Sequence, residues 1–219
     1  MDSSVTSPVT DAPYCLIAEL TYRCPLRCPY CSNPVELHAL KHELTTWDWE
    51  RLLREAAALG VVQVHFTGGE PLVRSDLCEL VRTARDAGLY SHLITAGVNL
   101  SSDRLAQLQG AGLDAIQISL QDSQSSSNDW LAGLASFDKK KQSFHVAKQL
   151  GLPVTLNVVV HRHNIERISE MIALAVEWQA DRVEIAHVQY VGWAYHNYRA
   201  LLPSVSQLRR AKAAVARAR

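Results

Sequence analysis

Short apolar runs alternate along the chain with longer segments in which apolar residues recur every three or four positions. The runs are rich in β-branched residues and have the length of single strands. They cover residues 15–20, 61–67, 90–95, 115–120, 154–160 and 182–188. The pattern therefore predicts six strands, each followed by a helix.

Helix start and stop signals frame the amphipathic segments. A capping-box pattern, Thr45-x-x-Asp48, precedes the first predicted helix, and Gly60 follows it. The second helix is expected to have Ser75 as its N-cap and to end before Gly88. The other helices are predicted over about residues 102–109, 139–150, 165–178 and 206–218.

Six successive strand–helix units predict an α/β fold with a mostly parallel sheet, because parallel strands need crossovers and helices usually supply them. Six units are two fewer than a closed eight-stranded barrel has. Two arrangements fit this count: a partial (β/α)6 barrel of the TIM type, left open, or a doubly wound sheet. In both, ligands bind at the carboxyl ends of the strands, so the residues that directly follow each strand are the candidates for chemistry.

The composition excludes several classes of protein. Of the 219 residues, 47% are hydrophobic and 20% are charged, which is a globular balance. Lys and Arg number 22, as do Asp and Glu, so the chain lacks the basic surplus of a nucleic-acid or anionic-membrane binder. No apolar run approaches the roughly 20 residues of a transmembrane helix. The polar start lacks the features of a signal peptide, and we expect a cytoplasmic protein.

Three of the five cysteines form the motif C-x3-C-x2-C, at Cys24, Cys28 and Cys31, directly after the first predicted strand. A tight cysteine cluster indicates a metal site before it indicates disulfides. A structural zinc site needs a fourth ligand, which His38 or His42 could supply. Iron–sulfur clusters usually take four cysteines, so three would leave one iron open to an exogenous ligand.

A second motif, Thr67-Gly68-Gly69-Glu70-Pro71, directly follows the second predicted strand. Paired glycines let the backbone approach a ligand closely, and amides with a carboxylate can hold an ammonium and a carboxylate together. The same residues also occur in plain strand-to-helix turns. Because neighbouring parallel strands end at the same edge of a sheet, both motifs are expected to lie side by side.

Together, the two motifs resemble the hallmark motifs of the radical S-adenosylmethionine (SAM) superfamily, and the resemblance extends over about residues 14–202. It implies a [4Fe–4S] cluster held by Cys24, Cys28 and Cys31, with the amine and carboxylate of SAM on the fourth iron. One electron would cleave SAM to methionine and a 5′-deoxyadenosyl radical, which abstracts a hydrogen atom from the substrate. In such enzymes the cofactor carries the radical chemistry, and the protein positions and shields it.

The resemblance also implies the residues that contact SAM. Tyr30, the aromatic residue before the last cysteine, would lie beside the adenine. Gly68, Gly69 and Glu70 would receive the methionyl amine. No residue is singled out as acting on the substrate itself.

Strand alternation adds two candidates for SAM binding. Gln117 and Ser119 share one face of the fourth strand, which should line the barrel, and Ser119 matches a ribose- or carboxylate-contacting position of the family. On the next strand Asn157 is the expected ribose contact, and Thr95 is a further candidate. Without the cysteine motif, Ser119 and Asn157 would be interpreted as ordinary hydrogen-bonded core residues.

Three stretches resemble one branch of the superfamily, the peptide-crosslinking enzymes of pyrroloquinoline quinone biosynthesis. They are RCPLRCPYCSNP (23–34), QISLQDS (117–123) and VQYVGWAYHNYRALLP (188–203), of which the general family motifs do not require the last. The resemblance implies a carbon–carbon bond between a Glu and a Tyr side chain of a precursor peptide. It also implies two partners, a small PqqD-like peptide-carrier chaperone and a flavodoxin-type electron donor. The alternatives are a molybdopterin-precursor or thioether-forming relative, and a zinc-binding interaction module.

The expected domain division is a polar leader (1–13), a radical SAM core (14–203) and a C-terminal helix (204–219). Enzymes of this branch are longer and carry auxiliary iron–sulfur clusters in a cysteine-rich C-terminal domain, into which this helix would lead. Two polar runs are expected at the surface. Residues 122–128 (DSQSSSN) are predicted to form a mobile loop, and Lys139–Lys141 a solvated helix start.

Overall fold

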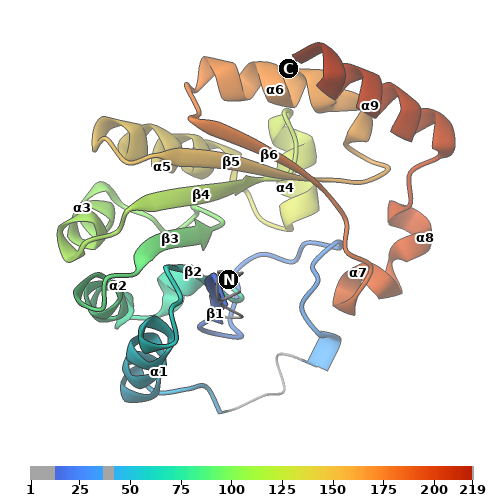
Figure 1. Cartoon of the computed structure of the whole chain (residues 1–219). Coiled ribbons are helices and arrows are strands. Elements are labelled where there is room, and N and C mark those ends of the chain that lie inside the picture. Colours follow the sequence, from blue (N-terminus) through green and yellow to red (C-terminus); the bar gives the residue numbers. More distant parts are fainter. Residues whose placement is uncertain (1–12, 37–41, 219) are drawn as a thin grey trace, which may run out of the picture.

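The computed structural model describes residues 13–36 and 42–218 (Figure 1). Six strands form one parallel sheet in the order β1-β2-β3-β4-β5-β6. Their bounds are β1 Cys15–Glu19, β2 Gln63–Thr67, β3 Tyr90–Thr95, β4 Ala115–Leu120, β5 Val154–Val160 and β6 Arg182–His187. Each strand pairs with its neighbours in sequence, so β1 and β6 are the edges and the sheet is not closed.

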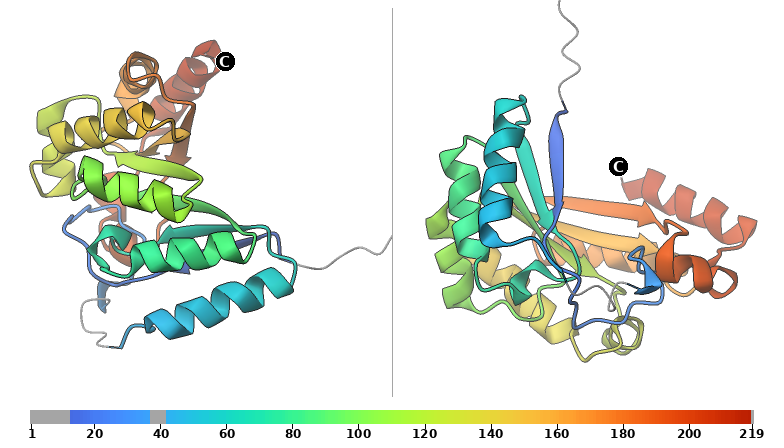
Figure 2. Two further views of the ribbon diagram at one scale, coloured as in Figure 1. Left: turned by 90° about the vertical axis from the view of Figure 1, so that its left-hand side faces the viewer. Right: turned by 90° about the horizontal axis from the view of Figure 1, so that it is seen from below.

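The helices follow the strands along the chain. They are α1 Thr46–Ala58, α2 Leu77–Asp86, α3 Ser102–Ala111, α4 Ser125–Ala132, α5 Phe137–Gln149, α6 Ile168–Glu177, α7 Gly192–His196, α8 Tyr198–Leu201 and α9 Val205–Ala218, with short 3-10 turns η2 Pro71–Val73 and η3 Ile165–Arg167. Figures 1 and 2 show α1, α2, α3 and α5 as a layer on one face of the sheet, while α9 lies outside α6. No helix among the described residues has the length and apolar character needed to cross a bilayer.

The strand order distinguishes the two arrangements that the sequence allows. In a doubly wound sheet the order reverses at a switch point, whereas here it runs without reversal from β1 to β6. Right-handed crossovers without reversal place the helices on one face, as in a barrel. The partial (β/α)6 barrel is therefore confirmed.

The core fills the space between the sheet and the helix layer. Phe66 and Ile118 from the strands pack there with Leu53, Leu80 and other apolar helix residues, and all four of these side chains are fully buried. The opposite, concave face of β4 and β5 carries the polar side chains, and Ser119 pairs in register with Asn157 across these two strands. This face leads to the carboxyl ends of the strands, where the candidate site residues lie.

The polar run 122–128 is not a loop, and this prediction was wrong. Its second half begins helix α4, and Asp122 is fully buried. The Asp122 carboxylate accepts hydrogen bonds from the Arg167 guanidinium and from Ser127 Oγ. Because these partners satisfy the buried charge, a segment with the composition of a loop is ordered instead.

The predicted N-cap of the second helix was also misplaced. Asp76, not Ser75, is the N-cap of α2, and its carboxylate does not cap the helix. It accepts instead from Arg74 Nη2 at 2.6 Å and from Thr46 Oγ1 at 2.6 Å, which ties α2 to the start of α1. The predicted polar leader lies almost wholly outside the described residues.

Candidate functional site

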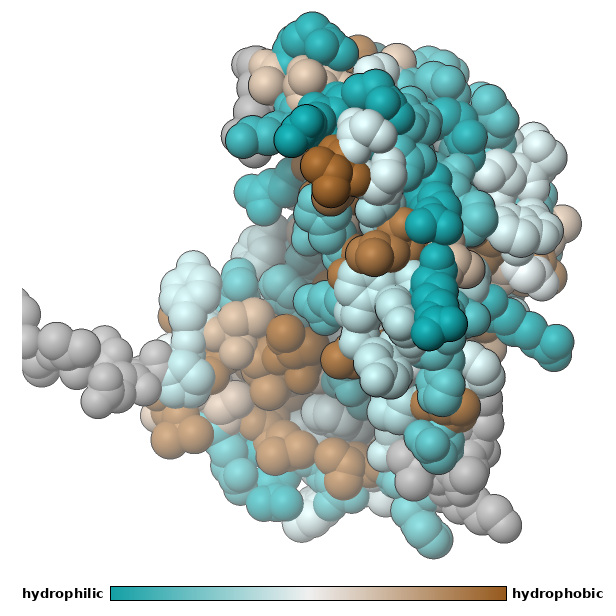
Figure 3. All heavy atoms as spheres, turned by 90° about the vertical axis from the view of Figure 1, so that its right-hand side faces the viewer, coloured by the Kyte–Doolittle hydropathy of each residue, from teal (hydrophilic) through white to brown (hydrophobic). Residues whose placement is uncertain are grey.

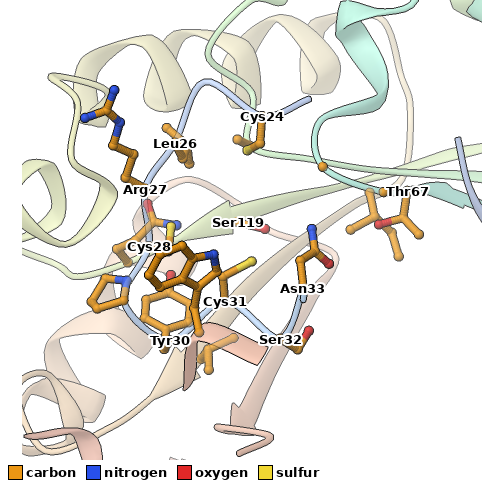
Figure 4. A pocket seen from close by; sticks show the side chains of 18 of the residues that line it. Cys24, Leu26, Arg27, Cys28, Tyr30, Cys31, Ser32, Asn33, Thr67 and Ser119 are labelled. Atoms are coloured by element: carbon orange, nitrogen blue, oxygen red, sulfur yellow. The ribbon is translucent and has the colours of Figure 1, made fainter. Parts of the chain in front are cut away.

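The loop after β1 carries the three motif cysteines across the carboxyl end of the sheet. Figure 4 shows Cys24, Cys28 and Cys31 around a shared space, with Ser119 of β4 beyond them. Within the loop, the Cys31 amide donates to the Cys28 carbonyl at 3.1 Å, which closes a turn. The Arg27 amide donates to the carbonyl of Ala132 at the end of α4, at 2.8 Å. The loop is thus fixed by backbone bonds on both sides of Cys28.

The paired glycines after β2 pack directly on the backbone that leads into this loop. The Gly69 amide donates to the Thr21 carbonyl at 2.7 Å, and the Glu70 amide to the Arg23 carbonyl at 2.8 Å. A Cβ atom on Gly69 would stand 2.4 Å from the Arg23 carbonyl oxygen, and Gly68 has a φ of +131°. Glycine is therefore required for this close approach, which holds the two motifs side by side as expected.

A cavity of about 930 Å³ lies between the two motifs. The predicted site residues that line it are Cys24, Cys28, Tyr30, Cys31, Gly68, Gly69, Thr95 and Ser119. Figure 3, which views the open side of the sheet, shows this side hollowed, with hydrophobic residues gathered in its lower part. The hollow in this view lies on the face that carries no helix layer.

Glu70 and Thr95 use their side chains within the protein. Glu70 is fully buried, and its carboxylate accepts from Thr95 Oγ1 at 2.6 Å, from the Ala96 amide at 2.7 Å and from the Leu72 amide at 3.1 Å. Burial raises the pKa of Glu70, and these donors lower it in part. Glu70 does not line the cavity, so the backbone of Gly68 and Gly69 is the part of this motif that faces a ligand.

Lys140 is the charged residue that the sequence analysis missed at this site. The run Lys139–Lys141 was expected to be solvated, but Lys140 is fully buried. Its Nζ donates to the Ala96 carbonyl at 2.9 Å and to the Ser119 carbonyl at 2.7 Å. Burial lowers the pKa of Lys140 to about 8, although the nearby Glu70 carboxylate acts in the opposite direction. The signal that could have found Lys140 is its place on the buried face of α5, together with Ser143, Phe144 and Ala147.

Two polar atoms near the cavity have no protein partner within the described part of the chain. Gln121 Oε1 and Asn157 Oδ1 are both buried and unpaired. Gln121 lines the cavity, whereas Asn157 lies beside Ser119 on the neighbouring strand. Buried polar groups are rarely left unpaired, so these two acceptors fit a ligand that brings hydroxyl or amine donors, as the ribose and adenine of SAM do.

The aromatic residue of the cysteine motif is held by packing. The Tyr30 ring lies against the ring of His161, with 5.1 Å between the ring centres, and both Tyr30 and Val159 line the cavity. Burial raises the pKa of Tyr30, so its phenol stays protonated. The cavity thus offers a flat apolar wall of the kind that an adenine ring packs on.

The chemistry of the donor set fits an iron–sulfur cluster. Burial raises the pKa of Cys24 to about 11 and that of Cys28 to about 12, so both are neutral thiols until a metal centre displaces their protons. Within residues 13–36 and 42–218, no three His, Cys, Asp or Glu side chains converge closely enough to hold a single metal ion. His42 does not join the cysteines in such a group among the described residues, and His38 lies outside them. Three thiolates around a larger multi-iron cluster can stand farther apart.

Sequence reasoning also missed residues from beyond β6. Trp193 and Asn197, in and directly after α7, line the cavity, and so does Asn33 of the cysteine loop. They come from the segment 188–203, which was noticed only as a resemblance to one branch of the family. No local pattern places them at the site, because the contact joins parts of the chain about 160 residues apart.

Comparisons with known proteins agree with this geometry. A family model of the radical SAM superfamily matches residues 18–175. The chain is 52% identical over 201 residues to a PqqA peptide cyclase of Xanthomonas euvesicatoria, which is 91% of this chain and 54% of that protein. It is 48% identical over 217 residues to a PqqA peptide cyclase of Methylobacterium nodulans, covering 99% of this chain and 57% of that protein. The chain thus spans about half the length of these relatives.

Solved structures share the fold. The structure of Streptococcus suis SuiB bound to its precursor peptide SuiA superposes on 93% of this chain and 45% of its own, with a TM-score of 0.78 and 23% identity. The structure of anSMEcpe with bound AdoMet covers 81% of this chain and 50% of its own, with a TM-score of 0.67 and 18% identity. At these identities the likeness concerns the fold alone.

Proposed function

This chain belongs to the radical SAM superfamily, and from that premise we propose that it forms the SAM-cleaving part of a peptide cyclase. Members of the superfamily use a [4Fe–4S] cluster and SAM. The proposed reaction joins a Glu and a Tyr side chain of a precursor peptide by a carbon–carbon bond, in pyrroloquinoline quinone biosynthesis. The relatives at about 50% identity, which are named PqqA peptide cyclases, support this assignment.

The observation that carries the proposal is the junction of the two motifs at one cavity. The backbone that leads into the cysteine loop is bound at Thr21 and Arg23 by the amides of Gly69 and Glu70, and both motifs line the same space of about 930 Å³. Cys24, Cys28 and Cys31 would hold the cluster. When bound, the cluster supplies the electron that cleaves SAM.

The side chains around this space would position SAM. We assign the adenine to the wall formed by Tyr30 and Val159, and the ribose hydroxyls to Ser119 and the unpaired Asn157 Oδ1. The methionyl amine would be received by the backbone of Gly68 and Gly69. Lys140 does not itself line the cavity, but it binds the carbonyls of Ala96 and Ser119, which do, so its positive charge lies behind the cavity wall and would favour the methionyl carboxylate.

The substrate and partners follow from the relatives. A precursor peptide would enter from the open, concave side of the sheet, the face without a helix layer. A PqqD-like chaperone would present the peptide, and a flavodoxin-type protein would supply electrons. Because this chain spans about half of its relatives, crosslinking is expected to need the remaining half as well, while SAM binding and cleavage need only the residues described above.

Anaerobic reconstitution tests the proposal. The chain should take up iron and sulfide, show the absorption of a [4Fe–4S] cluster and cleave SAM when reduced. Cys28→Ala should abolish both, while Cys78→Ala, whose thiol lies outside the motif, should retain both. Zinc bound in place of iron and sulfide would overturn the proposal. The crosslink is tested with a full-length enzyme that contains this chain. The mass of the precursor peptide should then fall by two hydrogens.

A further inference from the structure

The segment after β6 crosses to the opposite edge of the sheet and hydrogen-bonds the cysteine loop. The Ala194 amide donates to the Cys31 carbonyl at 2.9 Å, and the Trp193 amide to the Asn33 carbonyl at 3.3 Å. Asn197 Nδ2 donates to the Pro29 carbonyl at 3.0 Å. Three alternate carbonyls of the loop, at positions 29, 31 and 33, are thus all bound by this one segment.

These contacts join two strands that do not pair. β1 and β6 are the two edges of the sheet, and the cysteine loop follows β1 while the segment 188–203 follows β6. In Figure 1, α7 lies next to the loop that leaves β1. The incomplete barrel is therefore bridged at its carboxyl end, where the cysteines are, and stays open elsewhere between its edges.

The fit of the segment on the loop is too close for most side chains. A Cβ atom on Gly192 would stand 2.0 Å from the Asn33 carbonyl oxygen and 2.6 Å from that of Ser32, and Gly192 has a φ of +55°. Ala194 is fully buried in a small cluster with Val188 and Leu201, against which Tyr30 packs. A larger residue at either position would push the segment off the loop.

The far end of the segment is anchored as well. The Arg162 amide donates to the Leu201 carbonyl at 2.8 Å, and Arg162 Nε to the Leu202 carbonyl at 2.9 Å. Arg162 lies just beyond β5, so the segment is held between the end of a central strand and the cysteine loop. It therefore acts as a fixed support for the loop and not as a mobile cover.

We propose that residues Gly192–Asn197 form a latch that holds the backbone of Cys28–Cys31 in the conformation that binds the cluster and slows loss of the cluster. The proposal rests on the proposed function, because it concerns the same cysteines. The direction of the Cys31 side chain is set by its backbone, and Ala194 binds that backbone at the Cys31 carbonyl. Gly192 and Asn197 are positioning residues in this account: they act through the loop and not on the cluster itself.

The latch accounts for the residue types at three positions of the stretch 188–203. Gly192 leaves room for the Asn33 carbonyl, Ala194 is buried against the loop, and Asn197 supplies an amide donor to Pro29. The steric demand on Gly192 and the donor role of Asn197 make the proposal testable by small substitutions.

The test uses two variants and one matched control. Gly192→Ala introduces the colliding Cβ atom, and Asn197→Asp replaces the amide donor by an acceptor that faces the Pro29 carbonyl. Gly110→Ala is the control, because a Cβ atom there meets nothing within 4 Å. Hydrogen–deuterium exchange of the cluster-free chain should be about tenfold faster over residues 28–34 in both variants, as expected when one or two hydrogen bonds are lost, with β2–β5 unchanged.

The second readout is the rate at which an iron chelator removes the reconstituted cluster under anaerobic conditions. We expect about a tenfold faster loss from Gly192→Ala and Asn197→Asp than from wild type and Gly110→Ala, while urea unfolding shows that all the cluster-free chains are folded. Wild-type rates for both loop exchange and cluster loss in Asn197→Asp would overturn the latch, even if Gly192→Ala does not fold. A wild-type chain that fails to load iron and sulfide would instead overturn the proposed function, while the exchange experiment would still decide whether the latch holds the loop.

Discussion

The variant Lys140→Met tests whether Lys140 is a buried functional cation or an ordinary helix residue. Methionine has nearly the length of lysine and no charge, so the variant keeps the packing on α5 but removes the donors to the Ala96 and Ser119 carbonyls. Each carbonyl left without a partner costs about 1–3 kcal/mol. Against this, the variant no longer has to bury a charge, whose pKa is lowered from 10.5 to about 8. This lowering of the pKa corresponds to about 3 kcal/mol.

The two contributions oppose each other at pH 7, and their different pH dependence reveals the charge. Between pH 8 and 10.5 the unfolded chain keeps the Lys140 proton while the folded chain has released it. Stability rises with pH wherever the unfolded state binds more protons, so wild type gains up to about 3 kcal/mol relative to Lys140→Met across this window. Below pH 8 both states are protonated and the difference between the two chains is constant.

Urea unfolding of the cluster-free chain at pH 7, 9 and 10.5, with a reductant present, measures this difference. Lys139→Met is the matched control, since Lys139 is exposed on the same helix and its loss should leave the pH slope unchanged. SAM affinity of the reconstituted protein should fall about tenfold in Lys140→Met only, because the attraction between the buried charge and the methionyl carboxylate is lost. If the free energy of unfolding has the same pH slope in wild type and Lys140→Met, the buried charge is refuted. If the two proteins bind SAM with equal affinity, the role of Lys140 in binding is refuted.

Two further substitutions distinguish a residue that stabilises the site, Glu70, from a residue that is proposed to contact SAM, Asn157. Glu70→Gln places an amide donor among the three donors that surround the carboxylate, so the chain should lose about 1–3 kcal/mol in urea unfolding, and full stability would contradict the hydrogen bonds described for Glu70. Asn157→Ala removes a group whose Oδ1 has no protein partner in the described structure, so stability should barely change. SAM affinity, measured by equilibrium binding to the reconstituted protein, should nevertheless fall about two- to tenfold in Asn157→Ala, and an unchanged affinity would exclude Asn157 as a ribose contact.

The fold could be predicted because its elements depend on local periodicity. Strands β3, β4 and β5 have the predicted bounds, since a buried parallel strand is a continuous apolar run between turn residues. β2 begins at Gln63 and not at Val61, because the Val61 amide is used to close the end of α1 on the Ala56 carbonyl. An apolar residue that packs beside a strand cannot be distinguished by sequence from one inside it.

The location of the site could also be predicted, but its supports could not. Two motifs at the ends of neighbouring strands must meet, whatever the rest of the chain does. The tertiary structure decides which backbone the glycines approach. Gly69 packs on the backbone of Arg23, in addition to any ligand. The same holds for Asn197, whose bond to Pro29 spans 168 residues and leaves no local pattern.

Two interpretations failed for a common physical reason. Asp122 and Lys140 stand in polar runs, and polar runs are usually exposed because a buried charge is costly without a partner. Each of these residues finds partners on other elements, Asp122 on Arg167 and Lys140 on two strand-end carbonyls. Composition cannot reveal such partners, whereas helical periodicity can, because Lys140 falls on the apolar face of α5. A lysine on the apolar face of a crossover helix, near the carboxyl ends of the strands, is therefore better interpreted as part of a site than as part of the solvated surface.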